Sequence, residues 1–308
     1  MPVGNSEKGV GLWAGQVMFS SDQMIDYIDW FHGPLRGDDE QRDHKGNMIS
    51  SLLNPKLTIG ITNYWNLTLG TTLGQRSMGW ESGFNSIHHR DESTNTDFNN
   101  SIGGYLGDSK IIANYLVFND GQGIGKRFYL GGGLVIPSKN TLTSDPFFLS
   151  GEEKEQHRHF SLSEGVYKSI FETQYFLKRN TNPVFIGGVF TLTSPLMENK
   201  YGFKSGTVYD VALTGITREI VRLKGALGGS INIQKNTGSF WNGKLAPNSK
   251  STILVFGISS VWSIKHSGIN FNIRFPVFLK GGFSEDIENI DQEIKGLQIS
   301  IGYRKKFN

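Results

Sequence analysis

Histidine and carboxylate side chains gather in the first three long polar stretches of the chain, and both residue types bind divalent transition metals. If these stretches fold over one opening, their imidazole and carboxylate groups would converge and hold Zn²⁺ or Cu²⁺. However, no helical HExxH spacing fixes such a geometry, and polar surface loops hold polar residues in any case. A metal site is therefore an alternative, and its candidate ligands are His88, His89, His157 and His159.

His266 and Ser267 place a base beside a hydroxyl nucleophile, the pair that many hydrolases use. In an extended strand, adjacent residues point to opposite faces, so these two side chains would not share a proton. We find no other credible catalytic set in the sequence. We therefore predict that the protein is not an enzyme and needs no cofactor.

Charged side chains recur at alternate positions in extended segments of the C-terminal half, as they would along one face of a strand. If this face lines an enclosed bore, two interpretations are open. A ladder of cations would lower the entry energy of anionic solutes, whereas pairing across strands, such as Arg222 with Asp210, would fill the bore. The residues concerned are Arg222, Lys224, Arg274, Lys280, Arg304, Glu172 and Asp210.

The spacing of the apolar segments indicates which elements carry these residues. Long polar gaps alternate with short turns, which is typical of an up-and-down transmembrane β-barrel with turns at one end and long loops at the other. The long gaps are Ser21–Asn54, Ser77–Gly107, Ser138–Ser163, Pro195–Gly206, Lys235–Lys250 and Gly281–Glu293. The short turns are Asn63–Asn66, Asn119–Lys126, Lys178–Asn182, Arg218–Ile220 and Ser263–Gly268.

Each apolar segment alternates residue by residue, so that a strand would have one apolar and one polar face. Val221–Gln234 and Ile269–Lys280 show this clearly, and the polar faces are rich in Gly, Ser, Thr and Asn, which suits a hydrated lumen. We predict about twelve strands, most of them long enough to cross a bilayer at a tilt. They lie near Val10–Ser20, Lys56–Thr62, Leu67–Arg76, Asp108–Phe118, Arg127–Pro137, Glu164–Leu177, Pro183–Ser194, Thr207–Thr217, Val221–Gln234, Ser251–Trp262, Ile269–Lys280 and Ile294–Phe307.

The composition agrees with an all-β chain, because its 308 residues include 39 Gly and 21 Phe but only 9 Pro. The absence of Cys excludes disulfides and thiolate metal sites. The net charge of +3 is too small and too dispersed to indicate nucleic-acid binding. No apolar run is long enough for a membrane-spanning helix. We expect a single domain over residues 1–308.

Aromatic residues flank the short turns, where they would anchor the wall at the depth of the lipid headgroups. The alternative is that strands favour aromatic residues wherever they lie. The residues of this expected girdle are Tyr64, Trp65, Phe128, Tyr129, Tyr175, Phe176 and Trp262.

Two features of the N-terminal region bear on the bore. Met24–Phe31 has apolar residues at partly helical spacing, and we expect a short helix in the mouth of the barrel or on its rim. The segment before Val10 is too short for a plug domain, which argues against an energy-coupled transporter. The chain opens Met1-Pro2-Val3-Gly4 without a secretory signal, so we expect the sequence to begin after a cleavage site with an added or retained Met.

The last segment carries alternating apolar residues and ends in Phe307 and Asn308. It resembles the C-terminal strand of Gram-negative outer-membrane barrels, which ends in an aromatic residue and is read by the barrel-assembly machinery. Lys305, at a position that is usually apolar, and Asn308 depart from that pattern.

A second resemblance covers about a third of the chain. Asp108–Lys139 runs from a strand through an Asn-Asp-Gly-rich turn and a Gly-rich strand to Ile136-Pro137-Ser138-Lys139. This order resembles the outer-membrane transporters of the phenol-degradation (MetA-pathway) family. The resemblance implies a barrel of this size that passes small molecules, including hydrophobic or aromatic ones.

Together these patterns predict a Gram-negative outer-membrane channel for small solutes, surrounded by lipid and lipopolysaccharide, with short periplasmic turns and long extracellular loops. One alternative is a plugged barrel whose loops bind a partner or an ion. Another is a soluble all-β protein such as a sandwich or a propeller, in which the apolar faces would be buried between stacked layers.

Overall fold

The computed structural model describes residues 11–32, 43–81, 92–120, 123–146, 158, 160–246, 249–280 and 292–307. Within these ranges the chain forms strands almost throughout, with one short 3₁₀ helix, η1 (Val221–Leu223). The long strands are β1 (Val17–His32), β2 (His44–Gly60), β3 (Trp65–Trp80), β5 (Leu106–Asn119), β6 (Gly125–Ile136), β7 (Lys168–Lys178), β8 (Phe185–Pro195), β10 (Val208–Ile216), β11 (Ala226–Thr237), β14 (Lys250–Ile264), β15 (Ser267–Lys280) and β16 (Gln292–Phe307). The two-residue strands are β4 (Glu92–Ser93), β9 (Phe203–Lys204), β12 (Phe240–Trp241) and β13 (Lys244–Leu245).

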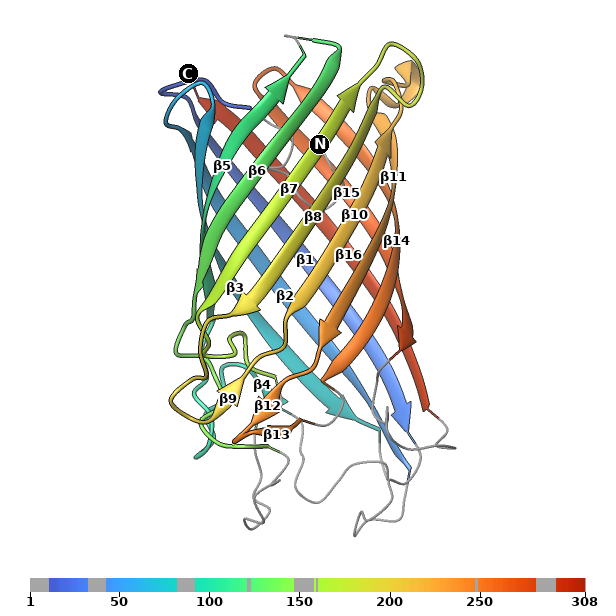
Figure 1. The fold of residues 1–308 in the computed structure, drawn as a ribbon. Coiled ribbons are helices and arrows are strands. Elements are labelled where there is room, and N and C mark those ends of the chain that lie inside the picture. Colours follow the sequence, from blue (N-terminus) through green and yellow to red (C-terminus); the bar gives the residue numbers. More distant parts are fainter. Residues whose placement is uncertain are drawn as a thin grey trace.

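The long strands form one closed antiparallel barrel (Figure 1). Each long strand pairs with the long strands before and after it in sequence, including β2 with β3. The pairing of the first strand, β1, with the last, β16, closes the ring. Twelve tilted strands result, as the sequence predicts, and both ends of the described chain lie where the short turns are (Figure 1). The two-residue strands belong to the opposite, long-loop end.

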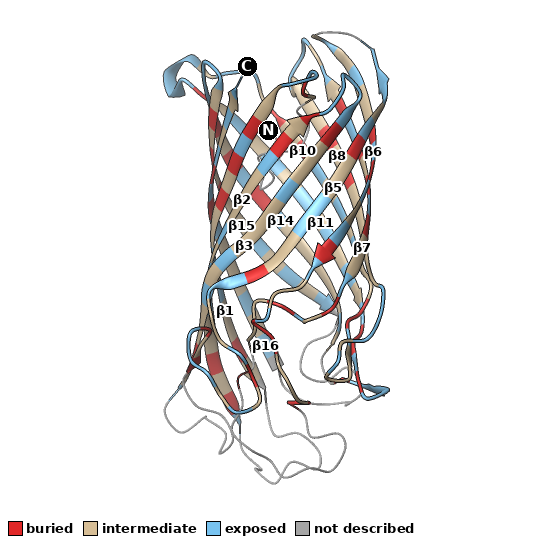
Figure 2. Cartoon of the chain, turned by 90° about the vertical axis from the view of Figure 1, so that its left-hand side faces the viewer, coloured by how far each residue is buried: buried red, intermediate tan, exposed pale blue. Residues whose placement is uncertain are grey.

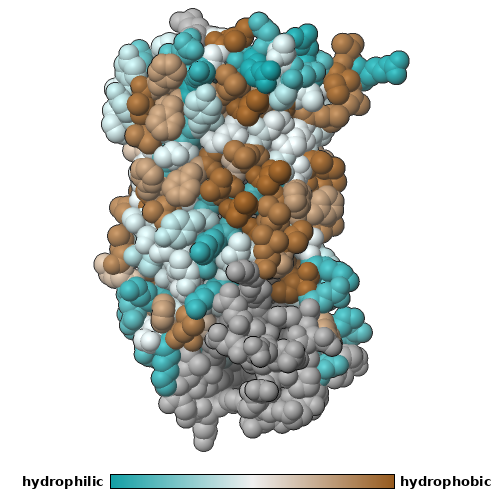
Figure 3. Space-filling model, turned by 45° about the vertical axis from the view of Figure 1, so that its right-hand side comes forward, coloured by the Kyte–Doolittle hydropathy of each residue, from teal (hydrophilic) through white to brown (hydrophobic). Residues whose placement is uncertain are grey.

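Side-chain direction confirms which face meets lipid. Along β11 the residues alternate strictly between exposed and partly buried, and Ile231 and Ile233 point outward while Asn232 and Gln234 point into the bore. Figure 2 shows the same alternation of buried and exposed residues along other strands. Hydrophobic side chains gather over the middle of the outer surface (Figure 3). The alternative of apolar faces buried between stacked sheets is therefore wrong.

The first two strands are longer than the sequence predicts. The predicted helix at Met24–Phe31 is wrong, because β1 continues through it and every residue has a register partner in both β2 and β16. The polar gap from residue 21 onward is misleading because Asp22 and Asp26 face the bore, where polar residues belong. No helix among the described residues is long and apolar enough to span a bilayer.

The register of the wall shifts at three places. These irregularities lie between Thr71 and Leu73, between Leu116 and Phe118, and between Thr252 and Ile253. Each shift lets one strand carry an extra residue against its neighbour, which locally bends the wall.

The aromatic girdle is confirmed in part. Trp65 and Tyr115 project outward beside the first short turn, with ring centroids 4.9 Å apart, and Tyr175 is also exposed. Tyr129 and Phe176 were predicted in the girdle too, but each is 3% exposed and points into the bore. Adjacent aromatic residues on a strand face opposite sides, so only one member of each pair reaches the lipid.

A pair of substitutions tests the assignment of the two faces. Ile231→Arg places a charge on the lipid side and should lower the free energy of unfolding by about 2–4 kcal/mol near the bilayer midplane. Gln234→Arg, on the same strand but lining the bore, should cost less than about 1 kcal/mol because the new cation stays hydrated. Urea unfolding in phospholipid vesicles measures both, and equal losses would contradict the assignment.

Candidate functional site

The bore contains a chamber of about 500 Å³, lined by inward-facing side chains from all twelve long strands. Most of the lining is polar, with Asn, Gln, Ser and Thr from many strands. Charged groups project into it as well, and these are Asp22, Lys56, Asp108, Lys110, Glu172, Asp210 and Arg274. The lining residues are therefore mainly polar, as a hydrated lumen requires, with acids and bases interspersed.

Most of these charges have a direct partner on the same strand or on a neighbouring one. Lys56 Nζ lies 3.4 Å from Asp22 Oδ2, and both side chains are largely buried. Gln174 Nε2 donates to Glu172 Oε1 at 2.6 Å, and Glu172 is only 2% exposed. Asn232 Nδ2 donates to Asp210 Oδ2 at 2.8 Å. Glu172 and Asp210 thus line the bore as predicted, but as members of a fixed polar network.

Two arginines on the bore face have a different character. Arg274 lines the chamber, within electrostatic range of Asp22 and Asp210, yet its guanidinium makes no ion pair or hydrogen bond with the described residues. Arg304 on β16 also points inward, nearer the short-turn end, and likewise has no such partner in the described part of the chain. Lys280 is the last residue of β15, and its side chain lies outside the description.

The predicted lumen position is wrong for Arg222 and Lys224. β11 begins at Ala226, and both residues lie in the preceding turn, Arg222 in η1 and Lys224 in the left-handed conformation with φ of 48°. Both are exposed at the short-turn end, so the proposed pairing of Arg222 with Asp210 does not occur. Apolar and polar residues alternate from 221 to 234 without a break at the turn, so the sequence pattern did not indicate where the strand begins.

On the short-turn side of the chamber, an aromatic cluster narrows the bore. Tyr129, Phe176 and Val189 are buried together, and Phe185 stacks on Phe176 with ring centroids 5.5 Å apart. We call Tyr129, Phe176 and Phe185 the aromatic floor. Tyr129 also belongs to the chamber lining, so the floor bounds the chamber on the short-turn side.

The segment before β1 crosses the same end of the barrel. Leu12 is 3% exposed and lies against Gly60 of β2, where an added Cβ would come within 3.1 Å of Leu12 Cβ. An added Cβ on Gly11 would meet the Tyr129 hydroxyl of β6 at 2.9 Å. The segment therefore runs from β6 toward β2 beside the aromatic floor, and a glycine at position 11 allows the close approach to Tyr129.

A belt of buried polar residues surrounds this narrow region. Each carries at least one polar atom without a hydrogen-bond partner among the described residues, and such groups need water or a polar solute. The members of this belt are Ser20, Asn66, Asn114, Tyr129, Ser259, Asn270 and Asn272. The narrow part of the bore therefore has polar groups on its wall that can bind water.

At the long-loop end, Arg158 joins two loops. Its guanidinium is fully buried and donates to the carbonyl of Thr94 at 2.8 Å, to that of Ile102, and to Asn140 Oδ1 at 2.8 Å. Burial lowers the pKa of Arg158, and the carboxylate of Glu92 opposes that shift. Arginine stays charged despite such a shift, so the loop contacts persist at neutral pH.

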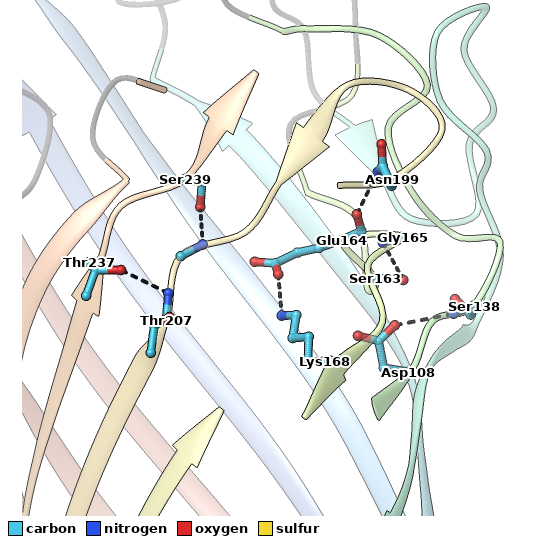
Figure 4. Close-up of polar contacts among 11 residues, drawn as sticks. Asp108, Ser138, Ser163, Glu164, Gly165, Lys168, Asn199, Thr207, Thr237 and Ser239 are labelled. Carbon is cyan, nitrogen blue, oxygen red and sulfur yellow. Dashed lines mark hydrogen bonds and ion pairs between the residues drawn. The ribbon is translucent and has the colours of Figure 1, made fainter. Parts of the chain in front are cut away.

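Further polar contacts extend this framework across the same end (Figure 4). Asp108 Oδ1 accepts from the Ser138 N–H at 3.3 Å, and Lys168 pairs with Glu164. Asn199 Nδ2 donates to the Glu164 carbonyl at 3.0 Å, which connects a third loop. The described segments of these three loops are therefore joined by hydrogen bonds into a rim beside the mouth of the bore.

The candidate metal ligands His88, His89, His157 and His159 lie outside the described residues. Within the described ranges, no group of three or more His, Asp or Glu side chains could hold a metal ion. The sequence pattern did not identify Arg158 as a loop contact, nor Tyr129 and Phe176 as residues of the bore. Strict alternation through the aromatic pairs would have found the latter two.

No family model matches the chain, and no curated protein sequence matches it. Its fold is similar to that of a COG4313 outer membrane channel from Pseudomonas putida F1, with a TM-score of 0.65 at 12% identity over 98% of this chain and 99% of that one. A TodX mutant monoaromatic hydrocarbon channel gives 0.46 at 10% identity over 96% and 91%, too low a score to support an inference. The predicted fold class, a single up-and-down antiparallel β-barrel of about twelve strands, is confirmed.

Replacing Arg158 tests the loop framework. Arg158→Met should loosen the loop segments at 92–105, 138–146 and 160–163 because several carbonyl groups lose their donor, at about 1–3 kcal/mol for each buried group left unpaired. Hydrogen exchange and limited proteolysis should show faster exchange and cleavage there, with β5–β8 unchanged. Arg158→Lys is the control, since it keeps the charge but not the forked donors. Its exchange and cleavage rates should lie between those of the parent and of Arg158→Met. Unchanged loop protection in Arg158→Met would contradict this role.

Proposed function

We propose that the protein is a passive channel of the bacterial outer membrane through which small solutes cross. The observation that best supports this is the chamber, because a wall with an apolar outer face encloses about 500 Å³ whose lining residues are mainly polar types. Barrels of about eight strands fill their bore with side chains, and those of about sixteen or more leave a wide aqueous channel. Twelve strands suit a narrow, selective passage.

In this proposal the long loops face the exterior and the short turns face the periplasm, the arrangement of bacterial barrels. A solute enters beside the loops held by Arg158, occupies the chamber, and leaves past the aromatic floor. The residues that set selectivity are Arg274, Arg304, Glu172 and Asp210, through charge and hydrogen bonding. Transport needs no covalent chemistry, and we propose no enzymatic activity.

A plugged barrel is the second candidate, because the aromatic floor and the segment at residues 11–12 narrow the bore at one end. Conductance in planar bilayers separates the two. Discrete steps at neutral pH in potassium chloride support the channel. Membranes that contain correctly folded protein, shown by its heat-modifiable migration on gels, but carry no steps would overturn it.

The aromatic floor should limit conductance. Tyr129→Ala removes the ring that borders the chamber, and we expect single-channel conductance to rise roughly twofold or more because the narrowest cross-section widens. Tyr129→Phe keeps the ring and loses only the hydroxyl, so its conductance should stay near that of the parent. If the alanine and phenylalanine variants conduct alike, the floor does not limit passage.

We also propose that the assembly machinery of the outer membrane reads β16. Phe307 supports this, since it projects outward with 44% exposure at the end of the chain and pairs with Val17 of β1. Phe307→Ala should slow assembly in cells by roughly tenfold while leaving refolding in detergent unchanged, because recognition rather than stability is lost. Phe275→Ala, another exposed outward phenylalanine, is the control; equal assembly defects in both would point to stability alone.

A further inference from the structure

The chamber has two unlike walls. Side chains of β5–β10 contribute an apolar patch that consists of Ile112, Tyr129, Ile170, Val189 and Ala212. Ile112 and Ile170 are both register partners of Gly133, and an added Cβ on that glycine would meet Ile112 Cγ1 at 3.0 Å, so Ile112 packs closely over β6. Among the described lining residues outside β5–β10, the apolar ones are Met24 and Val255.

The opposite wall is polar and carries Arg274. In the ring of twelve strands β15 lies six places from β6, and Figure 1 shows β5–β8 on the near side with β15, β16 and β1 behind them. Arg274 on β15 therefore faces the apolar patch across the chamber. A solute between the two walls meets hydrocarbon on one side and a guanidinium on the other.

Arg274 differs from the other charged groups of the chamber in the described structure. Asp22 pairs with Lys56, Glu172 binds Gln174, Asp210 binds Asn232, and Asp108 binds the Ser138 N–H. Lys110 also has a contact of its own. The Arg274 guanidinium has no direct partner among the described residues, although its forked N–H groups can hold a carboxylate by two parallel hydrogen bonds.

We propose that the chamber binds small amphiphilic monocarboxylates, with the carboxylate on Arg274 and the hydrocarbon body against Ile112 and Ile170. This inference rests on the proposed channel function, for which it names the class of solute. The carboxylates of Asp22 and Asp210 lie within electrostatic range of Arg274 but accept hydrogen bonds from Lys56 and Asn232, so the Arg274 N–H groups keep their donor capacity at the chamber wall.

Glu172 fixes the orientation of the solute. Its carboxylate belongs to β7, on the same side as the apolar patch, and is held by Gln174. A solute carboxylate pointing to that side would meet the like charge of Glu172. One pointing to β15 meets the Arg274 cation, beside which Asp22 is paired with Lys56 and Asp210 binds Asn232. The buried position of Glu172 also makes it a poor partner for a cationic solute, because its exposed fraction is 2%.

Isothermal titration of the full chain in detergent tests the proposal with four probes. Benzoate carries both the ring and the carboxylate, benzyl alcohol carries the ring without charge, acetate carries the charge without the ring, and benzylamine reverses the charge. We expect benzoate to bind best, and the affinity of each other probe to be lower by about tenfold or more. Titration into detergent alone corrects for partition into micelles.

Variants separate the two walls. Arg274→Gln should weaken benzoate binding about tenfold, the loss of a charge-assisted hydrogen bond, and leave benzyl alcohol unchanged. Arg274→Lys should restore part of the affinity. Ile112→Thr should weaken benzoate about threefold or more by removing apolar contact, with acetate unchanged. Arg222→Gln removes an arginine from the exposed turn and should change nothing.

The outcomes are distinguishable from those of the channel test. Benzoate binding that survives Arg274→Gln, or tighter binding of benzylamine than of benzoate, would overturn the inference. Conductance steps in potassium chloride without any benzoate binding would leave the channel standing and refute the solute class. Benzoate binding that depends on Arg274 in a barrel without conductance would support the site and refute the channel.

Discussion

The closed ladder of backbone hydrogen bonds is the constraint on which the whole molecule depends. Lipid offers no partner to an N–H or C=O group, so a sheet in a membrane cannot have a free edge. The pairing of β2 with β3, together with that of β1 with β16, removes both edges. Once the ring is closed, each residue of a strand faces either lipid or the bore, and this division explains why Ile231 and Asn232 are neighbours with opposite surroundings.

The bore inherits a second constraint, because polar groups inside it must be paired or hydrated. In the chamber most charged side chains are paired with a polar or charged neighbour, as in Asp22 with Lys56 and Asp210 with Asn232. In the polar belt on the short-turn side of the chamber, several polar atoms have no partner among the described residues and can bind water or solute instead. The aromatic floor lies at the same depth, so the narrowest region combines bulky rings with hydrogen-bonding groups. This combination restricts size without making the passage dry.

The alternation of the sequence was enough to predict the closed barrel, its strand number and its two faces. It placed Arg274, Glu172 and Asp210 correctly because each lies in the middle of a regular strand. It failed at Arg222 and Lys224, where the turn keeps the period of a strand, and at Met24–Phe31, where apolar residues occupy both faces of β1. Arg158 was beyond reach, because its partners Thr94, Ile102 and Asn140 come from distant loops and bind mostly through backbone carbonyls.

The three register shifts in the wall bear on how such a chain can change its length. A one-residue insertion inside a strand would exchange the lipid face and the bore face beyond it, which the fold cannot absorb. At Thr71–Leu73, Leu116–Phe118 and Thr252–Ile253 the ladder already accommodates an unequal count. Among the described strands, these are the places where relatives of different length can gain or lose a single residue while every other side chain keeps its orientation.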